Sequence, residues 1–271
     1  MPWQRLSGPR RRHVSRLGIR LLRAVLFDLG DTLVHLDRPW DEVFQASLEA
    51  LYGHLTQLGL RVDFKRFAKT YVRMFVDAAA TSSLYKIEIP LPDIMAKTLR
   101  KHKFGYLPPD LIQKAMEEYY RPEVEAWQIY PDTVDTLVAL RDTGFDLGLI
   151  SNAKSDYAVR TILKKFDLER FFKVIVTSAA LRLRKPRAEV FLRALDALKV
   201  KPCQAVFIGD SIDADILGAR ALGMRALHLV RKPRESAGTV DPDATVINLT
   251  QALAQITSWQ NTLLSNTVQS P

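Results

Sequence analysis

Short apolar runs recur along the chain, and most are followed by segments whose apolar residues repeat at helical spacing. The runs predict strands at residues 22–27, 146–150, 173–176, 205–208 and 226–230. Runs such as VLF, LGLI and AVFI are apolar at every position, which is typical of strands covered on both faces of a sheet. Helical spacing predicts helices at residues 133–141, 189–198 and 214–222. This alternation predicts an α/β fold with a doubly wound parallel, Rossmann-like sheet.

One long interval interrupts the alternation. More than a hundred residues separate the first two predicted strands, and the apolar residues there repeat at helical spacing. We expect helices at residues 40–58, 64–79, 94–101 and 111–120. The chain is therefore predicted to divide into an α/β core, residues 22–36 and 126–259, and an inserted α-helical cap domain, residues 37–125. Residues 260–271 are expected to form a polar C-terminal tail.

Positive charge is concentrated at the start of the chain. The formal net charge is +9, yet residues 1–23 hold seven arginines and no acid, so the remainder has 32 basic and 30 acidic residues. We expect residues 1–21 to form a disordered basic arm; an organelle presequence or a contact with an anionic partner is the alternative. The nearly neutral body disfavours a nucleic-acid partner.

Composition also bears on the compartment. No apolar run approaches the ~18 residues that a membrane span requires, so no membrane partner is expected. Cys203 is the single cysteine, which leaves no internal disulfide and is typical of a reducing compartment. We therefore expect a cytoplasmic protein. The sequence does not indicate its oligomeric state.

Polar residues follow the predicted strands at the points where they end. They are Asp28 after the first, Ser151 and Asn152 after the second, Lys185 beyond the third, and Asp210, Asp213 and Asp215 after the fourth. Ligands bind at the carboxyl ends of strands in open parallel sheets. Two neighbouring carboxylates there repel each other unless a cation lies between them, and hard oxygen ligands favour Mg²⁺. A carboxylate beside Mg²⁺ can attack a phosphoryl group, and Lys185 can neutralise phosphate charge.

Four segments resemble the motifs of the haloacid dehalogenase superfamily of hydrolases. They are LFDLGDTLV, LGLISN, RLRKPRAEVF and VFIGDSIDADILGARALGM, and the likeness covers residues 22–258. The helical interval between the first two is similar to the cap of subfamily I, which includes phosphoglycolate phosphatases.

The resemblance implies a role for each matching position. Asp28 would be the nucleophile, and Mg²⁺ would be held by Asp28, the Gly30 carbonyl and Asp210. Thr32, Ser151 and Lys185 would orient and stabilise the phosphoryl group, while Asn152 would contact substrate or cap the following helix. Asp215 would support the metal shell or Lys185. Asp213 is expected to be the N-cap of its helix.

The first motif departs from the family pattern at Gly30. Family phosphatases usually read Asp-x-Asp-Gly-Thr, and their second aspartate protonates the leaving oxygen, whereas this chain reads Asp28-Leu29-Gly30-Asp31-Thr32. General acid–base catalysis is worth ~10²–10⁴-fold in rate. Three answers are open: Asp31 reaches the site; His35 or a leaving group that needs no acid makes up for the loss; or the enzyme is feeble.

The pattern as a whole predicts a Mg²⁺-dependent hydrolase, a phosphatase that acts on a small phosphorylated metabolite through an aspartyl-phosphate on Asp28. One alternative is a binding or regulatory protein that keeps the fold but turns over poorly, because Gly30 replaces an acid. Another is a 2-haloacid dehalogenase, whose leaving halide needs no proton. The pair Gly209-Asp210 ranks the dehalogenase below the phosphatase, because that pair is typical of a metal site.

Overall fold

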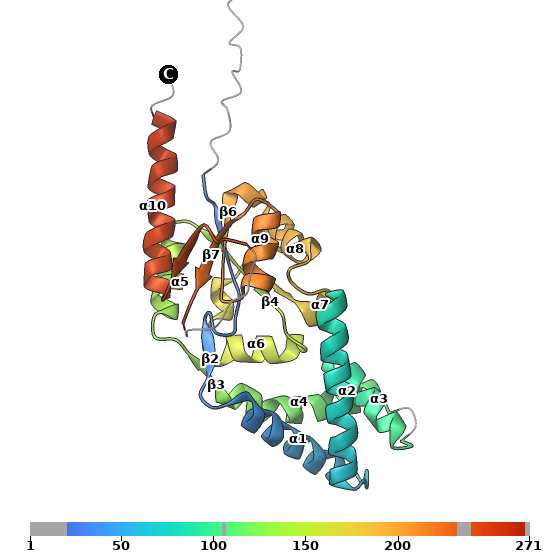
Figure 1. Cartoon of the computed structure of the whole chain (residues 1–271). Helices are drawn as coiled ribbons and strands as arrows, with labels where there is room; N and C mark the ends of the chain where they lie inside the picture. Colours follow the sequence, from blue (N-terminus) through green and yellow to red (C-terminus); the bar gives the residue numbers. More distant parts are fainter. Residues whose placement is uncertain (1–20, 105–106, 232–239, 269–271) are drawn as a thin grey trace, which may run out of the picture.

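A six-stranded parallel sheet forms the centre of the molecule (Figure 1). The computed structural model describes residues 21–104, 107–231 and 240–268. The strands are β1 (Ala24–Phe27), β4 (Asp146–Ser151), β5 (Val174–Thr177), β6 (Ala205–Gly209), β7 (Arg225–Leu229) and β8 (Ala244–Val246), in the order β5-β4-β1-β6-β7-β8. The predicted fold class and its five strands are confirmed, and β8 is an additional edge strand. Residues 1–20 of the predicted basic arm lie outside the described residues.

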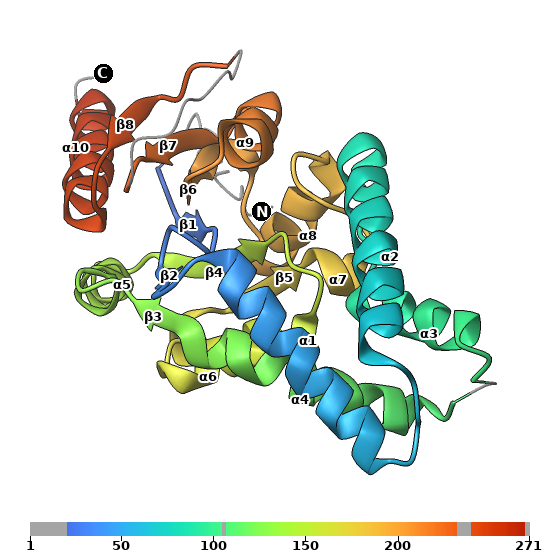
Figure 2. The same cartoon turned by 60° about the horizontal axis from the view of Figure 1, so that its bottom comes forward.

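Helices cover both faces of this sheet (Figure 2). The helices α5 (Thr133–Asp142), α6 (Asp156–Lys165) and α10 (Leu249–Val268) pack on one face, and α8 (Ala188–Leu198) and α9 (Leu217–Ala221) pack on the other. Side chains of a strand alternate between its faces. Val25 and Phe27 of β1 accordingly join the first core cluster, while Leu26 joins the second. Burial on both sides explains why the strand is apolar at every position.

The end of the chain differs from its prediction. Residues 260–268 belong to α10, where the sequence pattern predicted a polar tail. The helix continues because its side chains remain in contact with the core: Trp259 and Leu263 pack against it. Gln260 also satisfies both backbone groups of Leu22, accepting from its N–H at 3.0 Å and donating to its carbonyl at 3.2 Å.

Four helices lie between two short strands and form a second body beside the sheet (Figures 1 and 2). They are α1 (Trp40–Gln57), α2 (Phe64–Tyr85), α3 (Leu91–Lys101) and α4 (Pro109–Ala126), between β2 (Val34–Leu36) and β3 (Trp127–Ile129). We call residues 37–126 the helical insertion. It has its own core, which includes Leu51, Phe67 and Tyr71. β2 and β3 pair in antiparallel fashion, so the two chain connections to the insertion run side by side.

The remaining elements are short. They are α7 (Ser178–Leu181), two 3₁₀ turns at Glu169–Phe171 and Pro202–Gln204, and a π-helical turn at Ile212–Ile216 that leads into α9. Across the part of the chain that the structure describes, every helix is too short or too polar to cross a membrane.

Candidate active site

The polar residues predicted at the strand ends meet at one edge of the sheet. β4, β1 and β6 are neighbours and run in the same direction, so their carboxyl ends lie side by side. Ser151 is the last residue of β4, Asp28 follows β1, and Asp210 follows β6. The N–H of Asp28 donates to the carbonyl of Ile208 at 2.9 Å, which extends the β1–β6 ladder to the candidate nucleophile.

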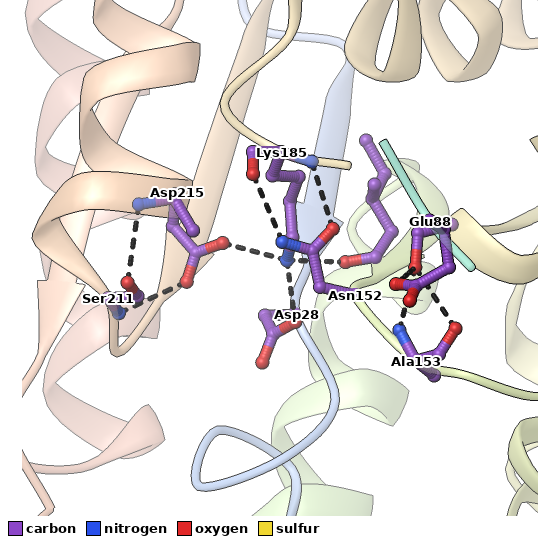
Figure 3. A network of polar contacts seen from close by, with 10 residues as sticks. Asp28, Glu88, Asn152, Ala153, Lys185, Ser211 and Asp215 are labelled. Carbon is purple, nitrogen blue, oxygen red and sulfur yellow. Dashed lines mark hydrogen bonds and ion pairs between the residues drawn. The ribbon is translucent and has the colours of Figure 1, made fainter. Parts of the chain in front are cut away.

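Lys185 is the centre of this edge (Figure 3). Its side chain is only 1% exposed, although the residue lies in the loop between α7 and α8. The ammonium donates to Oδ1 of Asp28 at 2.6 Å and to the carbonyl of Ile150 at 2.7 Å, and it pairs with Oδ1 of Asp215 at 2.7 Å. A buried ammonium is costly unless it is paired and hydrogen-bonded. These partners meet that requirement and fix the position of the charge.

Asn152 holds the backbone of the same lysine (Figure 3). Its amide donates to the carbonyl of Lys185 at 3.1 Å and its Oδ1 accepts from the N–H of Lys185 at 2.9 Å. The expectation that Asn152 caps the following helix is wrong, because Ser155 caps α6 by accepting from the N–H of Ala158. Asn152 therefore connects the end of β4 to the loop that carries Lys185.

Asp215 is buried in the π-helical turn after β6. Its Oδ2 accepts from the N–H of Ser211 at 3.1 Å, while Oδ1 faces Lys185. A Cβ atom on Gly209 would lie 2.2 Å from Oδ2, so the glycine leaves the space that this carboxylate occupies. The expectation that Asp213 caps the helix is wrong: the hydroxyl of Ser211 accepts from the N–H of Ala214 and is the cap.

Negative charge exceeds positive charge at this edge. Asp28, Asp210 and Asp215 each place a carboxylate oxygen within 4.8 Å of the others. Burial raises the pKa of Asp28 to about 7; Lys185 opposes this shift, and Asp215 and Asp210 add to it. Burial alone would lower the pKa of Lys185, but Asp215 and Asp28 outweigh it and raise that pKa. A hard divalent cation beside Asp28 and Asp210 fits this donor set, since it would offset the excess negative charge.

A cavity of about 520 Å³ opens between this edge and the helical insertion. Most of the predicted site residues line it: Asp28, Gly30, Asp31, Ser151, Asn152, Lys185, Asp210 and Asp215. The structure does not bring Thr32 to this wall. Thr32 is fully buried, its hydroxyl has no hydrogen-bond partner, and its carbonyl accepts from Arg231 at 3.2 Å. His35 is also absent from the described lining; its ring lies against Tyr130 in the β2–β3 region.

Gly30 and Asp31 differ in backbone conformation within the turn after β1. The left-handed backbone conformation falls on Asp31, with φ of 52°, whereas Gly30 does not adopt it. The N–H of Asp31 donates to the carbonyl of Val34 at 2.7 Å, which closes the turn. A Cβ atom at Gly30 would lie 3.3 Å from Cη2 of Trp127. The indole of Trp127 therefore occupies the space into which a side chain at position 30 would extend.

A second polar cluster ties the insertion to the loop of Lys185. Ile87, between α2 and α3, forms an antiparallel bridge with Leu183. The neighbouring Glu88 has a fully buried side chain that pairs with Arg184 and, at 3.3 Å, with Lys154. It also accepts from the hydroxyl of Ser178 at 2.7 Å. Figure 3 shows this carboxylate beside the segment that follows Asn152.

Sequence reasoning missed the cavity residues that the insertion contributes. They include Trp40, Phe75, Tyr119, Tyr120 and Glu123. The helical pattern predicted α4 only as far as residue 120, and Pro122, which lies just beyond, is a residue that usually ends or kinks a helix. The helix instead continues through Pro122 to Ala126 and carries Glu123 to the cavity. The available signal was the pair Tyr119-Tyr120 followed by Glu123, but in a stretch with several glutamates it does not indicate a site.

Comparison with known proteins identifies the class that this fold and site define. A family model for haloacid dehalogenase-like hydrolases matches residues 22–223, so the chain belongs to this family of hydrolases. The family predicted from the motifs is confirmed.

Similar proteins cover most of the chain. It is 28% identical over 215 residues to glyceraldehyde 3-phosphate phosphatase of Methanopyrus kandleri, which covers 78% of this chain and 85% of that protein. It is 26% identical over 224 residues to ribulose-1,5-bisphosphate 5-phosphatase of Halopiger xanaduensis, covering 81% and 89%. A 2-haloacid dehalogenase structure from Pseudomonas syringae matches with a TM-score of 0.66 at 25% identity, covering 88% and 100%. A phosphatase structure of the same family from Thermococcus onnurineus matches with a TM-score of 0.57 at 24% identity, covering 87% and 98%.

Proposed function

We propose that the protein is a Mg²⁺-dependent phosphatase that hydrolyses a small phosphorylated metabolite through an aspartyl-phosphate on Asp28. The observation that supports it most is the buried ammonium of Lys185 between Asp28 and Asp215, at the wall of a cavity that also contains Asp210. Relatives named as sugar-phosphate phosphatases support the same substrate class. A cavity of about 520 Å³ accommodates a small molecule.

In this proposal each residue has a task. Asp28 attacks phosphorus, the bond from phosphorus to the ester oxygen breaks, and the departing oxygen takes a proton. Water then attacks the aspartyl-phosphate, gives up a proton and releases phosphate, which regenerates Asp28. Lys185 holds Asp28 in position and offsets phosphate charge, and the hydroxyl of Ser151 donates to a phosphoryl oxygen.

The metal would be held by Asp28, Asp210 and the carbonyl of Gly30, with Asp215 supporting Lys185. Bound there, Mg²⁺ supplies charge stabilisation for the phosphoryl oxygens. Because Asp28 must be ionised to attack, a cation that lowers its pKa from about 7 also increases the reactive fraction at neutral pH.

The dehalogenase function is the second candidate, and Gly30 is the observation that favours it. A leaving halide needs no proton, so a dehalogenase would not require an acid at position 30. Asp210 at the same edge favours the phosphatase. An aspartate that displaces a halide needs no metal, and so it needs no second carboxylate to bind one.

Hydrolysis of an aryl phosphate tests the proposal. We expect Mg²⁺-dependent turnover in the wild type, loss with a chelator and loss in Asp28→Asn. The control is Asp142→Asn, an exposed carboxylate at the end of α5 and away from the cavity lining, which should leave the rate unchanged. Halide release from a 2-haloacid without phosphate release would instead identify a dehalogenase. No turnover of either substrate would favour the alternative that the protein is a binding or regulatory protein.

A further inference from the structure

The phosphatase proposed above needs a proton donor, and the first motif has Gly30 at the position where the family's donor usually stands. In phosphoryl transfer the attacking and leaving oxygens lie roughly in line on opposite sides of phosphorus. The leaving oxygen therefore departs away from Asp28, toward the part of the cavity that the helical insertion lines. A donor for that oxygen has to come from the insertion or from the turn after β1.

Glu123 is the carboxylic acid that the insertion brings to this cavity. Among the described residues that line it, the acids are Asp28, Asp31, Asp210, Asp215 and Glu123. Asp28 is the nucleophile, Asp210 lies at the metal position, and Asp215 is committed to Lys185 and to the N–H of Ser211. Asp31 belongs to the tight turn at the core. Glu123 alone of the five comes from the insertion.

Trp127 lies against both Gly30, the position where the family's second aspartate is absent, and Glu123. Its ring fills the space beside Gly30, where a Cβ atom would lie 3.3 Å from Cη2. At the other edge of the same indole, Nε1 donates to Oε1 of Glu123 at 3.5 Å. One side chain thus occupies the place next to the glycine and orients the carboxyl of Glu123.

Resting on the proposed function, we infer that Glu123 is the general acid–base of this enzyme and takes over the task that Gly30 leaves open. Its carboxyl gives a proton to the oxygen that leaves phosphorus as the bond to Asp28 forms. The resulting carboxylate then takes a proton from the water that attacks the aspartyl-phosphate. The proton count closes over one turnover, and no other reactant is required.

The surroundings of Glu123 keep its proton in place near neutral pH. Burial raises its pKa to about 7, against the smaller opposing effect of the Trp127 hydrogen bond. Among the described residues no basic side chain forms an ion pair with it. The titratable groups that interact electrostatically with it are Tyr71 on α2 and Tyr119 and Tyr120 on its own helix. Of the basic groups nearby, Lys165 on α6 donates to the carbonyl of Trp127, and Lys154, which lines the same cavity, pairs with Glu88. A pKa close to the working pH suits a group that must give and regain a proton.

The test compares two esters that differ in their need for an acid. An alkyl phosphate such as glycerol phosphate leaves as a strongly basic oxygen, whereas an aryl phosphate leaves readily without protonation. In Glu123→Gln we expect kcat/KM for the alkyl ester to fall by ~10²–10⁴ and kcat/KM for the aryl ester to fall less than ~10-fold. This ratio reports the step that forms the aspartyl-phosphate, whereas kcat also includes its hydrolysis, which is common to both esters. The decline of the alkyl rate above about pH 7 should also disappear. Glu123→Asp should recover part of the alkyl rate.

The matched control is Glu125→Gln, two residues along the same helix, with a side chain that is 62% exposed. It should match the wild type with both esters. Equal losses of kcat/KM with the two esters in Glu123→Gln, or an unchanged kcat/KM for the alkyl ester, would overturn the assignment of Glu123. An alkyl-specific loss in Asp31→Asn instead would assign the acid to the turn. A wild type that hydrolyses neither ester would overturn the proposed function, and the role of Glu123 with it.

Discussion

Replacing Glu123 with glutamine should change how the stability of the protein depends on pH. The folded protein holds this carboxyl at a pKa of about 7, whereas the ordinary value is 4.5. The folded state therefore binds the proton more tightly than the unfolded state does. As pH rises from about 4.5 to about 7, the unfolded chain releases its proton first, and the free energy of unfolding of the wild type falls. Above that window it stays at the lower value.

The size of the effect follows from the difference in pKa. Each unit corresponds to 1.36 kcal/mol, so the full loss is about 3 kcal/mol. Part of this loss has already occurred at pH 5, so the free energy of unfolding of the wild type should fall by about 2.5 kcal/mol between pH 5 and pH 8. Glutamine has the shape of the protonated acid and still accepts from Trp127, but it does not titrate. We therefore compare the free energy of unfolding of the variant minus that of the wild type. This difference should be about 2.5 kcal/mol larger at pH 8 than at pH 5.

Urea unfolding at pH 5 and pH 8, in the absence of Mg²⁺, measures this difference. Asp28 also titrates near neutral pH, but it is present in both proteins and its contribution cancels. Glu125→Gln should follow the wild type at both pH values, because its carboxyl is exposed. If the gap between wild type and Glu123→Gln is the same at pH 5 and pH 8, Glu123 is ionised in the folded protein at both, and the reasoning from its burial is wrong.

Three further outcomes are expected. Gly209→Ala places a methyl group 2.2 Å from Oδ2 of Asp215, so it should lower the free energy of unfolding by about 1–3 kcal/mol and reduce turnover. Gly53→Ala, whose new Cβ meets nothing within 4 Å, is the control, and equal stability of the two variants would refute the packing argument. Glu88→Gln leaves two cations beside a neutral, fully buried amide and should cost about 3–5 kcal/mol in urea unfolding; a loss below about 1 kcal/mol would show that the ion pairs are dispensable. Mg²⁺ at about 100 times its Kd should stabilise the wild type by about 2.7 kcal/mol in thermal unfolding, and the gain should vanish in Asp210→Asn; a gain that survives this change would place the metal elsewhere.

The core was predictable because its signals are local. Buried parallel strands are apolar at every position, and their polar ends are adjacent in sequence, as at Asp28 and Asp210. Sheet order then brings those ends together, so the position of the site follows from the pattern alone. The sequence also placed Lys185 at this site, as a group that offsets phosphate charge. Its contact with Asp28, which spans 157 residues, was not predicted and is a finding of the structure.

The parts that sequence did not predict depend on tertiary contacts. α4 continues through Pro122 because it is packed against α1 and α6, and a local rule for proline cannot include that packing. The end of α10 is helical because Gln260 and its neighbours find partners in the core. The pKa of Glu123 is a further example, since it is raised by burial, which arises from tertiary packing and not from the local sequence.

The antiparallel pairing of β2 with β3 has a consequence for how such a protein diversifies. Val34 pairs with Ile129 and Leu36 with Trp127, so the chain leaves the core and returns to it at the same point. For the sheet, roughly 90 intervening residues amount to one closed loop, and the entropic cost of closing a loop grows only with the logarithm of its length. Helices can therefore be lengthened, shortened or exchanged there while the strand order stays intact. Asp28 and Lys185 belong to the part that such an exchange leaves alone, and Glu123 belongs to the part that it replaces. An exchanged insertion would therefore keep the nucleophile and change the proposed proton donor together with the other cavity residues that the insertion contributes.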